Sequence, residues 1–330
     1  MTGRAFDAWF LALSDPAGGS PPPPCSGAFD ARKLVELAGY HGVLPAVVRS
    51  LRRLEAPSAA VGSALALAQE RLLGGVGFAL RLRKQLEPLV AAFAAAGLPA
   101  IVLKGPEFAD RLYAEPALRP FTDLDFLLPR EAIAEAGEAL ARLGYRRATP
   151  RPGKYPGQYG EEIWLLDEPA AGAVELHWDL VNSPPLRRRC SVRYEDLQLE
   201  PQAAGLPRAS PAALLLIAGV HAAMSHRFDR LQPLGDVCQA ARGAAGPLDA
   251  VWLAEAAART GAAFALASAL GLAGALFREP ACSALVEGTP CLAVAGRPGP
   301  GILPPRAVIH PRSLAARARR QVYRELLKRR

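Results

Sequence analysis

Residues 100–128 read AIVLKGPEFADRLYAEPALRPFTDLDFLL, and this stretch decides the fold. It opens on a short apolar run, Ala100–Leu103, which predicts a buried strand that ends in a Lys104-Gly105 turn. A short helical stretch follows, and then a second strand candidate, Phe121–Leu128. A strand, a glycine turn and a helix N-terminus form a place where backbone N–H groups and a lysine can meet phosphate oxygens, although Lys-Gly-Pro is also an ordinary turn.

The second strand candidate carries two acids one residue apart. In an extended strand Asp123 and Asp125 point to the same face, about 6.6 Å apart along it, and Leu124 and Phe126 point to the opposite face, toward a core. Two carboxylates on one face repel each other unless a cation lies between them, and a divalent ion with oxygen ligands is one such cation. Acids on the solvent side of a surface strand give the same pattern, so a metal site here needs further support.

A third acid lies on another strand candidate, Val174–Leu180, which begins VELHW. Its period-two alternation places Glu175 and His177 on one face and three apolar residues on the other. If this strand lies beside the first two acids, Glu175 supplies the further charge that two divalent ions need. His177 then either contacts the metal-binding acids or the substrate, or it is a structural histidine whose hydrogen bonds are made within the fold.

Helical patterns flank these strands. Composition and spacing predict helices over six ranges: Val61–Leu73, Phe78–Ala96, Arg130–Leu143, Pro211–His226, Asp249–Thr260 and Ala262–Phe277. Ile163–Leu166 is a further short strand candidate. We therefore expect an α+β chain in four parts: an N-terminal helical region (1–86), an α/β core (87–205), a C-terminal helical domain (206–287), and a Pro/Gly-rich linker with a basic tail (288–330).

The last part of the chain combines two patterns. Gly288–Pro311 holds ten Gly or Pro among 24 residues, which indicates a linker or mobile loop. Ser313–Arg330 can form a basic helix, with an apolar stripe at Leu314, Ala318, Val322 and Leu326. Such a helix is either solvated or docked on a partner, or it contacts an acidic partner, nucleic acid or a membrane surface.

The net charge of +8 belongs to this tail. Residues 306–330 hold nine of the 39 Lys and Arg and one of the 31 Asp and Glu, which leaves 30 of each over residues 1–305. Because residues 1–305 carry no net charge, the composition gives no general reason to expect nucleic acid as the main partner. The longest uncharged stretch, Ala262–Phe277, is too short to span a bilayer, so we expect no membrane span.

The compartment follows from two further patterns. Residues 1–13 lack the basic start, apolar run and cleavage site of a signal peptide. The five cysteines are scattered, odd in number and never two residues apart, which argues against a disulfide framework or a zinc knuckle. Together these patterns predict a cytoplasmic protein.

Four segments carry a resemblance to a known family: VLKGPEFADRLYAEPALRPFTDLDFLLP, LARLGYR, VELHWDL and HAAMSHRFDRLQPLGDV. Their combination resembles the uncharacterised nucleotidyltransferase family with a Leu-Lys-Gly motif, which belongs to the polymerase-β-like nucleotidyltransferase superfamily. The resemblance covers about residues 80–260. It implies a mixed sheet with flanking helices, an NTP substrate and a metal site on adjacent strands.

The resemblance also implies roles for individual residues. Asp123 and Asp125 match the paired carboxylates that hold catalytic Mg²⁺, with two ions expected. Glu175 matches the third acid, which shares the metal or takes the proton of the attacking hydroxyl. Gly105 matches the glycine of the phosphate loop and Lys104 the lysine before it, where the wider superfamily usually has Gly-Ser.

Some residues near the motifs have two possible roles. Arg119, just before the acids, can hold a triphosphate oxygen or form a salt bridge. Tyr113 can stack on a base, although packing in the core is favoured. His221 and His226 are five apart and do not share one face of an α-helix, so packing is favoured over ligand binding. Asp236 belongs to the same family segment.

Three hypotheses of function follow. The first is Mg²⁺-dependent transfer of a nucleoside monophosphate from an NTP to an unknown acceptor hydroxyl, on a small molecule or a protein. The second is a non-catalytic nucleotide-binding or scaffold module with the same fold. The third gives the main role to the basic tail, residues 306–330, as an anchor on nucleic acid or an acidic partner.

Overall fold

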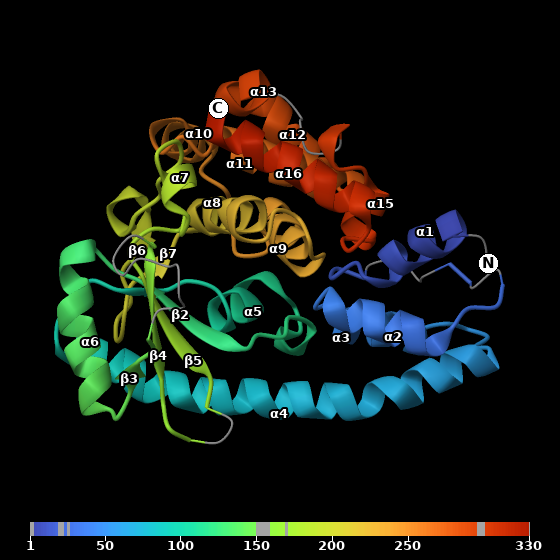
Figure 1. Cartoon of the computed structure of the whole chain (residues 1–330), viewed down its shortest axis with the longest axis horizontal. Helices are drawn as coiled ribbons and strands as arrows, with labels where there is room; N and C mark the ends of the chain where they lie inside the picture. The colour runs from blue at the N-terminus through green and yellow to red at the C-terminus, as the bar shows by residue number, and fades with distance from the viewer. Residues whose placement is uncertain are drawn as a thin grey trace.

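A mixed sheet lies between two helical regions in the computed structural model of the chain (Figure 1). The structure describes residues 3–18, 23–24, 27–149, 159–168, 171–295 and 301–329. The five strands of the sheet are β1 (Ile101–Val102), β2 (Asp123–Leu127), β3 (Arg146–Arg147), β4 (Glu161–Leu165) and β5 (Ala173–His177). Their order is β1-β2-β5-β4-β3, and β2 and β5 run parallel while the other neighbours are antiparallel.

Short helices connect and cover the sheet. They are α5 (Pro106–Leu112), α6 (Ile133–Arg142), α7 (Pro184–Arg187) and three 3₁₀ turns, η1 (Pro116–Leu118), η2 (Arg130–Ala132) and η3 (Tyr194–Asp196). A two-stranded ladder, β6 (Leu199–Glu200) with β7 (Arg208–Ala209), leads from the sheet to the C-terminal helices. The expected α+β class with a mixed sheet and helical flanks is confirmed.

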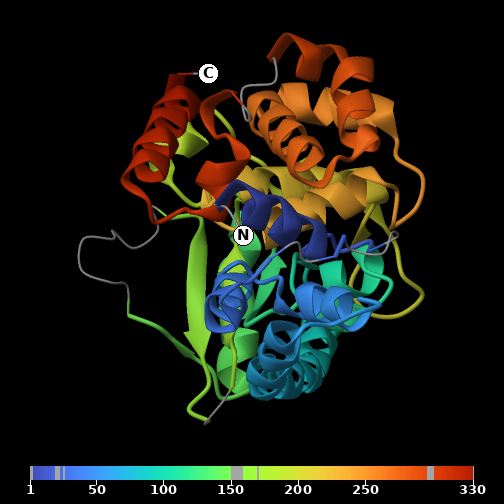
Figure 2. The same cartoon turned by 90° about the vertical axis from the view of Figure 1, so that its right-hand side faces the viewer.

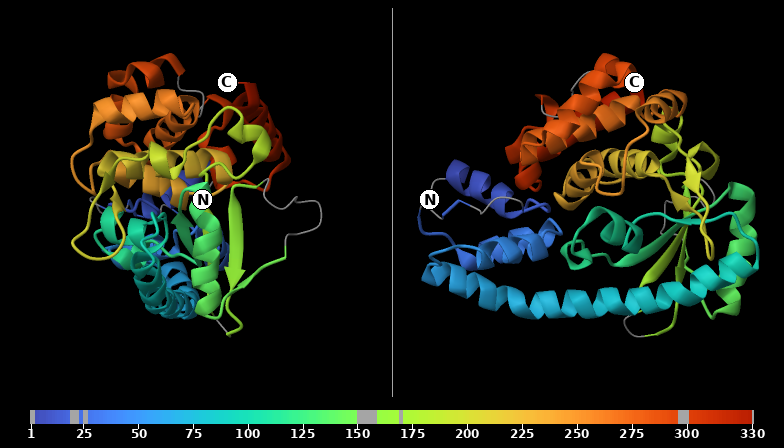
Figure 3. Two further views of the ribbon diagram at one scale, coloured as in Figure 1. Left: turned by 90° about the vertical axis from the view of Figure 1, so that its left-hand side faces the viewer. Right: turned by 180° about the vertical axis from the view of Figure 1, so that it is seen from behind.

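The N-terminal side consists of α1 (Gly3–Leu13), α2 (Ala31–Tyr40), α3 (Leu44–Arg52) and the long α4 (Ala59–Ala95). The C-terminal side is built from α8 (Pro211–Val220), the π-helical turn η4 (His221–Ser225), α9 (Gln232–Ala241), α10 (Ala250–Arg259), α11 (Ala263–Phe277), α12 (Pro280–Gly288), α13 (Pro290–Ala295), α15 (Pro305–Ile309) and α16 (Leu314–Arg329). Seen from behind, α4 runs along one edge of the molecule, below α1–α3 at one end and the sheet at the other (Figure 3).

The two faces of the sheet differ in chemistry because side chains alternate along each strand. Leu124 and Phe126 of β2, with Val174 and Leu176 of β5, are fully buried in a core shared with α4 and α6. The ring of Phe93 on α4 meets Phe126 edge-on, with centroids 4.9 Å apart. The opposite face carries the acids of β2 and β5 and lies toward the C-terminal helices.

Helix α4 joins the two helices expected over residues 61–73 and 78–96, and it crosses the expected boundary at residues 86 and 87. Gly74 and Gly75 lie inside it, each at a cost of about 1 kcal/mol relative to alanine. The helix continues through these glycines because both of its halves pack against other elements. Its first half buries Val61, Ala64 and Ala68 against α2 and α3, and its second half buries Leu82, Leu89 and Phe93 against the sheet.

The segment expected to be a linker, 288–311, contains α13 and α15 in its described part. Four of its apolar side chains are buried in the main core: Leu292, Leu303, Val308 and Ile309. His310, directly after α15, ties this segment to the first helix, because its Nε2 lies 2.8 Å from Asp7 Oδ1 of α1. Figure 2 shows α1 beside α15.

The helix expected over residues 313–330 is present as α16, and Leu314 and Val322 of its expected apolar stripe are exposed. Leu314 is 83% exposed and Val322 is 54% exposed. The residues that α16 buries are Ala316, Arg320, Tyr323 and Leu327. Their spacing of four, three and four follows the helical period, and it places the large ring of Tyr323 in the core. Arg320 donates to the backbone carbonyls of Ala307 and Pro311, which allows its charge to lie in this interface.

In the described part of the chain, no helix has the length and apolar character needed to cross a membrane.

Candidate active site

Three polar side chains meet where β2 and β5 run side by side. The parallel register places Asp125 directly beside Glu175. His177 follows on the same face of β5, and its Nε2 lies 2.9 Å from Asp125 Oδ1 and 3.3 Å from Glu175 Oε2. One ligand atom from each of the three residues lies within 4.8 Å of the others, so the cluster is able to hold a metal ion.

Lys104 contacts the same oxygen of Asp125 as His177 does, with Nζ 2.9 Å from Oδ1. Burial lowers the pKa of Lys104, but the carboxylates of Asp125 and Asp123 outweigh this effect and raise it above its ordinary value. Burial also acts to raise the pKa of Asp125, yet Lys104 and His177 hold it well below its ordinary value. The carboxylate is therefore ionised at all physiological pH values.

The second oxygen of this carboxylate carries the argument for a metal. Asp125 is 1% exposed, and its Oδ2 is buried without a hydrogen-bond partner among the described residues. A buried carboxylate oxygen is normally paired, because removing it from water is costly. An oxygen-preferring cation bound by Asp125 and Glu175 satisfies this atom, so the donor set fits a divalent ion.

Asp123 lies two residues earlier on the same strand and lines the same cavity as Glu175. Burial and the nearby charge of Asp125 raise the pKa of Asp123 to about 6, and Lys104 opposes this shift. A carboxyl group whose pKa is raised by neighbouring carboxylates gains from a cation, because the cation stabilises the ionised form of all of them. Asp123 is close enough to Asp125 and Glu175 for their charges to interact.

The glycine turn is held from behind by a buried ion pair. The Arg119 guanidinium donates from Nε and Nη2 to the two oxygens of Asp236, at 2.8 and 2.9 Å, and from Nη1 to the Gly105 carbonyl at 3.3 Å. Tyr113 donates its hydroxyl proton to the same carboxylate, at 2.8 Å. Of the two roles open to Arg119, the structure shows the salt bridge, and Tyr113 is buried with it.

Gly105 itself has φ +49° and ψ −119°, a conformation that side chains disfavour. A Cβ at this position would also meet the backbone oxygen of Asp123 at 3.3 Å. The turn thus brings Lys104 and the first acid-bearing strand into direct contact. The backbone N–H of Leu103 donates to the Asp125 carbonyl, at 2.9 Å, and completes this junction.

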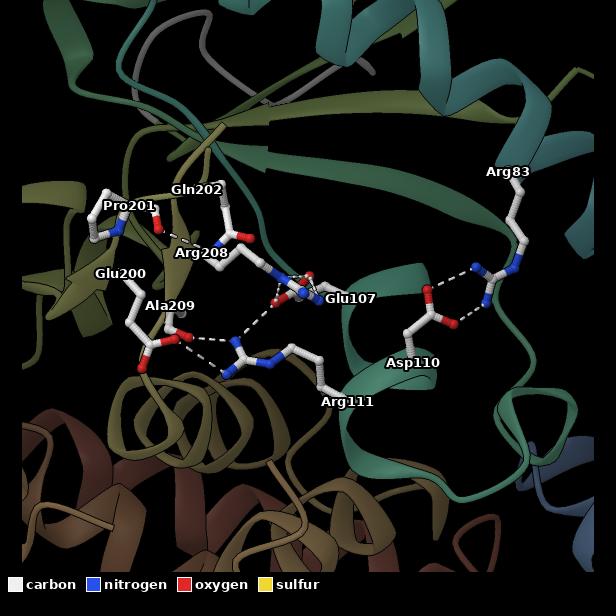
Figure 4. A network of polar contacts seen from close by, with 9 residues as sticks. All are labelled: Arg83, Glu107, Asp110, Arg111, Glu200, Pro201, Gln202, Arg208 and Ala209. Carbon is white, nitrogen blue, oxygen red and sulfur yellow. Dashed lines mark hydrogen bonds and ion pairs between the residues drawn. The ribbon is translucent and has the colours of Figure 1, made fainter. Parts of the chain in front are cut away.

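Polar contacts on both sides of α5 fix the turn in place (Figure 4). On one side Glu107 accepts hydrogen bonds from Arg111 and Arg208, which tie α5 to the β6–β7 ladder. On the other side Arg83 of α4 forms a bidentate pair with Asp110, at 2.6 and 2.8 Å. These contacts hold α5 between α4 and the β6–β7 ladder.

Above the acids lies a cavity of about 530 Å³. Its floor includes Lys104, Asp123, Glu175 and His177 from the sheet. Its other walls come from residues 180–186, from the π-helical turn η4 and from α16. A cavity of this size falls in the range that accommodates a small-molecule ligand.

His221, the first residue of η4, and His226, the residue directly after it, lie against each other, which an α-helix does not allow at this spacing. His221 and His226 are five residues apart, and the amide N–H of His226 donates to the His221 carbonyl, at 3.4 Å. This i→i+5 bond puts both rings on one side, edge-on with centroids 4.8 Å apart, and both line the cavity. Burial and the nearby charge of Lys104 hold the pKa of His221 well below its ordinary value, so it is neutral.

Several residues of the cavity were not predicted from the sequence. Oε2 of Glu161 on β4 lies 3.8 Å from His177 Nδ1, and Arg227 and Arg324, which come from outside the sheet, also line the cavity. Glu161 lies outside the quoted motifs, and nothing local marks Arg324 among the other arginines of the tail. Arg227 lies inside the HAAMSHRFDR segment, directly after His226.

Two comparisons bear on the identity of the chain. A search of curated proteins gave no match. A family model described as "Uncharacterised nucleotidyltransferase" matches residues 27–278, which include every element of the sheet and the π-helical turn. The model spans well over half of the chain and agrees with the resemblance carried by the Leu-Lys-Gly, Asp-Leu-Asp and Glu-Leu-His segments. The chain therefore belongs to the uncharacterised nucleotidyltransferase family.

Proposed function

We propose that this protein transfers a nucleoside monophosphate from an NTP to an acceptor hydroxyl in a reaction that depends on Mg²⁺. One observation carries the proposal. In a chain of a nucleotidyltransferase family, the buried Asp125 lies beside Glu175, which lines a cavity, and one oxygen of the Asp125 carboxylate is left unpaired among the described residues.

The acceptor oxygen forms a bond to the α-phosphorus, the bond from that phosphorus to the bridging oxygen of the β-phosphate breaks, and pyrophosphate leaves with the electron pair. The acceptor proton goes to Glu175, which lines the cavity. His177 does not take it, because hydrogen bonds with Asp125 and Glu175 outweigh burial and raise the pKa of His177 to about 9.

Asp123, Asp125 and Glu175 are the residues that would hold Mg²⁺, with two ions expected. The ions supply charge neutralisation on the phosphates and favour departure of the pyrophosphate. His177 orients the carboxylates of Asp125 and Glu175 through its hydrogen bonds. Lys104, which is paired with Asp125, and the Gly105 turn lie beside these acids, where they steady the α-phosphate of the bound nucleotide.

A comparison of wild type with matched variants tests the catalytic role. Purified wild type is incubated with Mg²⁺ and NTPs labelled at the α-phosphate, with a cell extract as the acceptor source, and label transfer and pyrophosphate release are measured. We expect Asp125→Asn and Asp123→Asn to abolish both signals, and Asp167→Asn, a change at a 90% exposed residue, to leave them intact. Equal activity in wild type and in a folded Asp125→Asn variant refutes the proposal.

A non-catalytic nucleotide-binding module is the second candidate. It is favoured by one observation, which is that Lys104 and His177 already neutralise Asp125 without an ion. Such a module would be stabilised by a nucleotide, because a ligand that binds only the folded state raises the midpoint of thermal unfolding. A rise in that midpoint with no label transfer for any NTP supports the module over the enzyme.

A further inference from the structure

We propose that Arg324 of α16 and Arg227, the second residue after the π-helical turn, form a subsite that binds the β- and γ-phosphates of the NTP. This inference rests on the proposed function and assigns a cationic wall to the same cavity. Arg324 lies beyond residues 27–278, the part of the chain that the family model matches. The subsite is therefore completed by a segment that the family model does not include.

The first support is that these two cations are available. Both side chains line the cavity and are half-buried, and in the described part of the chain neither guanidinium makes a hydrogen bond or an ion pair. The other cations near the floor are engaged. Arg119 is paired with Asp236, and Lys104 is paired with Asp125. Among the described residues that line this cavity, Arg227 and Arg324 are thus the arginines that remain able to bind an anion.

The second support is that both arginines are positioned by buried neighbours. Phe228 and Tyr323 are each fully buried, and their ring centroids lie 5.0 Å apart. Phe228 directly follows Arg227 in the sequence, and Tyr323 directly precedes Arg324. Arg227 and Phe228 also adopt positive φ values of 48° and 59°, a costly conformation that persists only where the surroundings impose it. The aromatic contact therefore ties together the two backbone segments that carry Arg227 and Arg324.

The third support is the distribution of charge in the cavity. Asp123, Glu161 and Glu175 on the floor are acidic, so they repel phosphate oxygens except where a metal ion lies between them. The wall formed by the residues after η4 and by α16 includes Arg227 and Arg324. An NTP with its α-phosphate over the acids then places its remaining phosphates at this wall, where planar guanidinium groups match phosphate oxygens. The same contacts stabilise the charge that develops on the leaving pyrophosphate.

The test uses the full chain and three probes measured by calorimetry with Mg²⁺. The probes are an NTP analogue that cannot be cleaved between the α- and β-phosphates, the matching nucleoside monophosphate, and inorganic tripolyphosphate. We expect Arg324→Gln to weaken binding of the analogue and of tripolyphosphate about 10- to 100-fold, as for loss of a hydrogen bond between charged groups. Monophosphate binding stays unchanged. Arg227→Gln gives the same selective loss.

Arg317→Gln is the matched control, because it removes the same charge from an exposed position on the same helix. Equal losses in Arg324→Gln and Arg317→Gln overturn the inference and indicate a general effect of charge. Equal losses for triphosphate and monophosphate probes also overturn it. If wild type binds no NTP analogue with Mg²⁺, the proposed function itself fails. If wild type binds the analogue and a folded Arg324→Gln variant binds it equally, only this inference fails.

Discussion

Replacement of Asp236 by asparagine tests whether the buried ion pair behind the glycine turn stabilises the fold. The Asp236 side chain is 1% exposed and that of Arg119 is 5% exposed. The substitution keeps the shape of the side chain but removes its charge, and it directs an amide N–H group toward donors of Arg119 or Tyr113. Loss of one partner of a buried pair costs about 3–5 kcal/mol, because the remaining charge is left without compensation.

Urea unfolding at 25 °C, followed by circular dichroism and by tryptophan fluorescence, measures this loss. Coincident transitions of the two signals are needed before a single free energy of unfolding is assigned. Asp167→Asn is the control, since its pair with Arg146 is 74% and 90% exposed and such pairs contribute less than about 1 kcal/mol. A loss of less than about 1 kcal/mol in Asp236→Asn refutes the reasoning.

Two further predictions concern the last helix and the pH dependence of the site. Tyr323→Ala should lower the free energy of unfolding by about 3–5 kcal/mol, while Val322→Ala should change it by less than about 0.5 kcal/mol. Equal effects of the two substitutions in urea unfolding would mean that Val322 packs against the protein as much as Tyr323 does. His177 should titrate near pH 9 by NMR without added metal, and a midpoint at or below its ordinary pKa of 6.5 would contradict its pairing with Asp125 and Glu175. Because its folded-state pKa is raised, the charged ring stabilises the fold fully below pH 6.5, and this stabilisation is lost as pH rises toward about 9.

The floor of the site was predictable because strand alternation is a local property. Period-two patterns placed Asp123 and Asp125 on one face of β2 and Glu175 and His177 on one face of β5, and the structure shows both arrangements. The sequence does not encode the strand order in a local pattern. That β2 and β5 are neighbours came from the family resemblance and from the structure, not from spacing.

The walls of the cavity were not predictable from local patterns. His221 and His226 converge only because η4 adopts a π-helical turn, and their five-residue spacing argues against convergence in the ordinary helix. Arg119 had two equally good roles until a distant carboxylate, Asp236, was found beside it. Arg324 is one of nine basic residues in a tail whose docking depends on long-range packing.

The position of α16 has a consequence for how the protein becomes active during its synthesis. A ribosome releases the N-terminal parts of a chain first, and these parts can fold while the rest is still being made. The strands that carry Asp123, Asp125 and Glu175 are complete long before α16 exists, so a nascent chain holds its acids without Arg324. If that arginine is needed to bind the triphosphate, a growing or prematurely terminated chain cannot consume nucleotide.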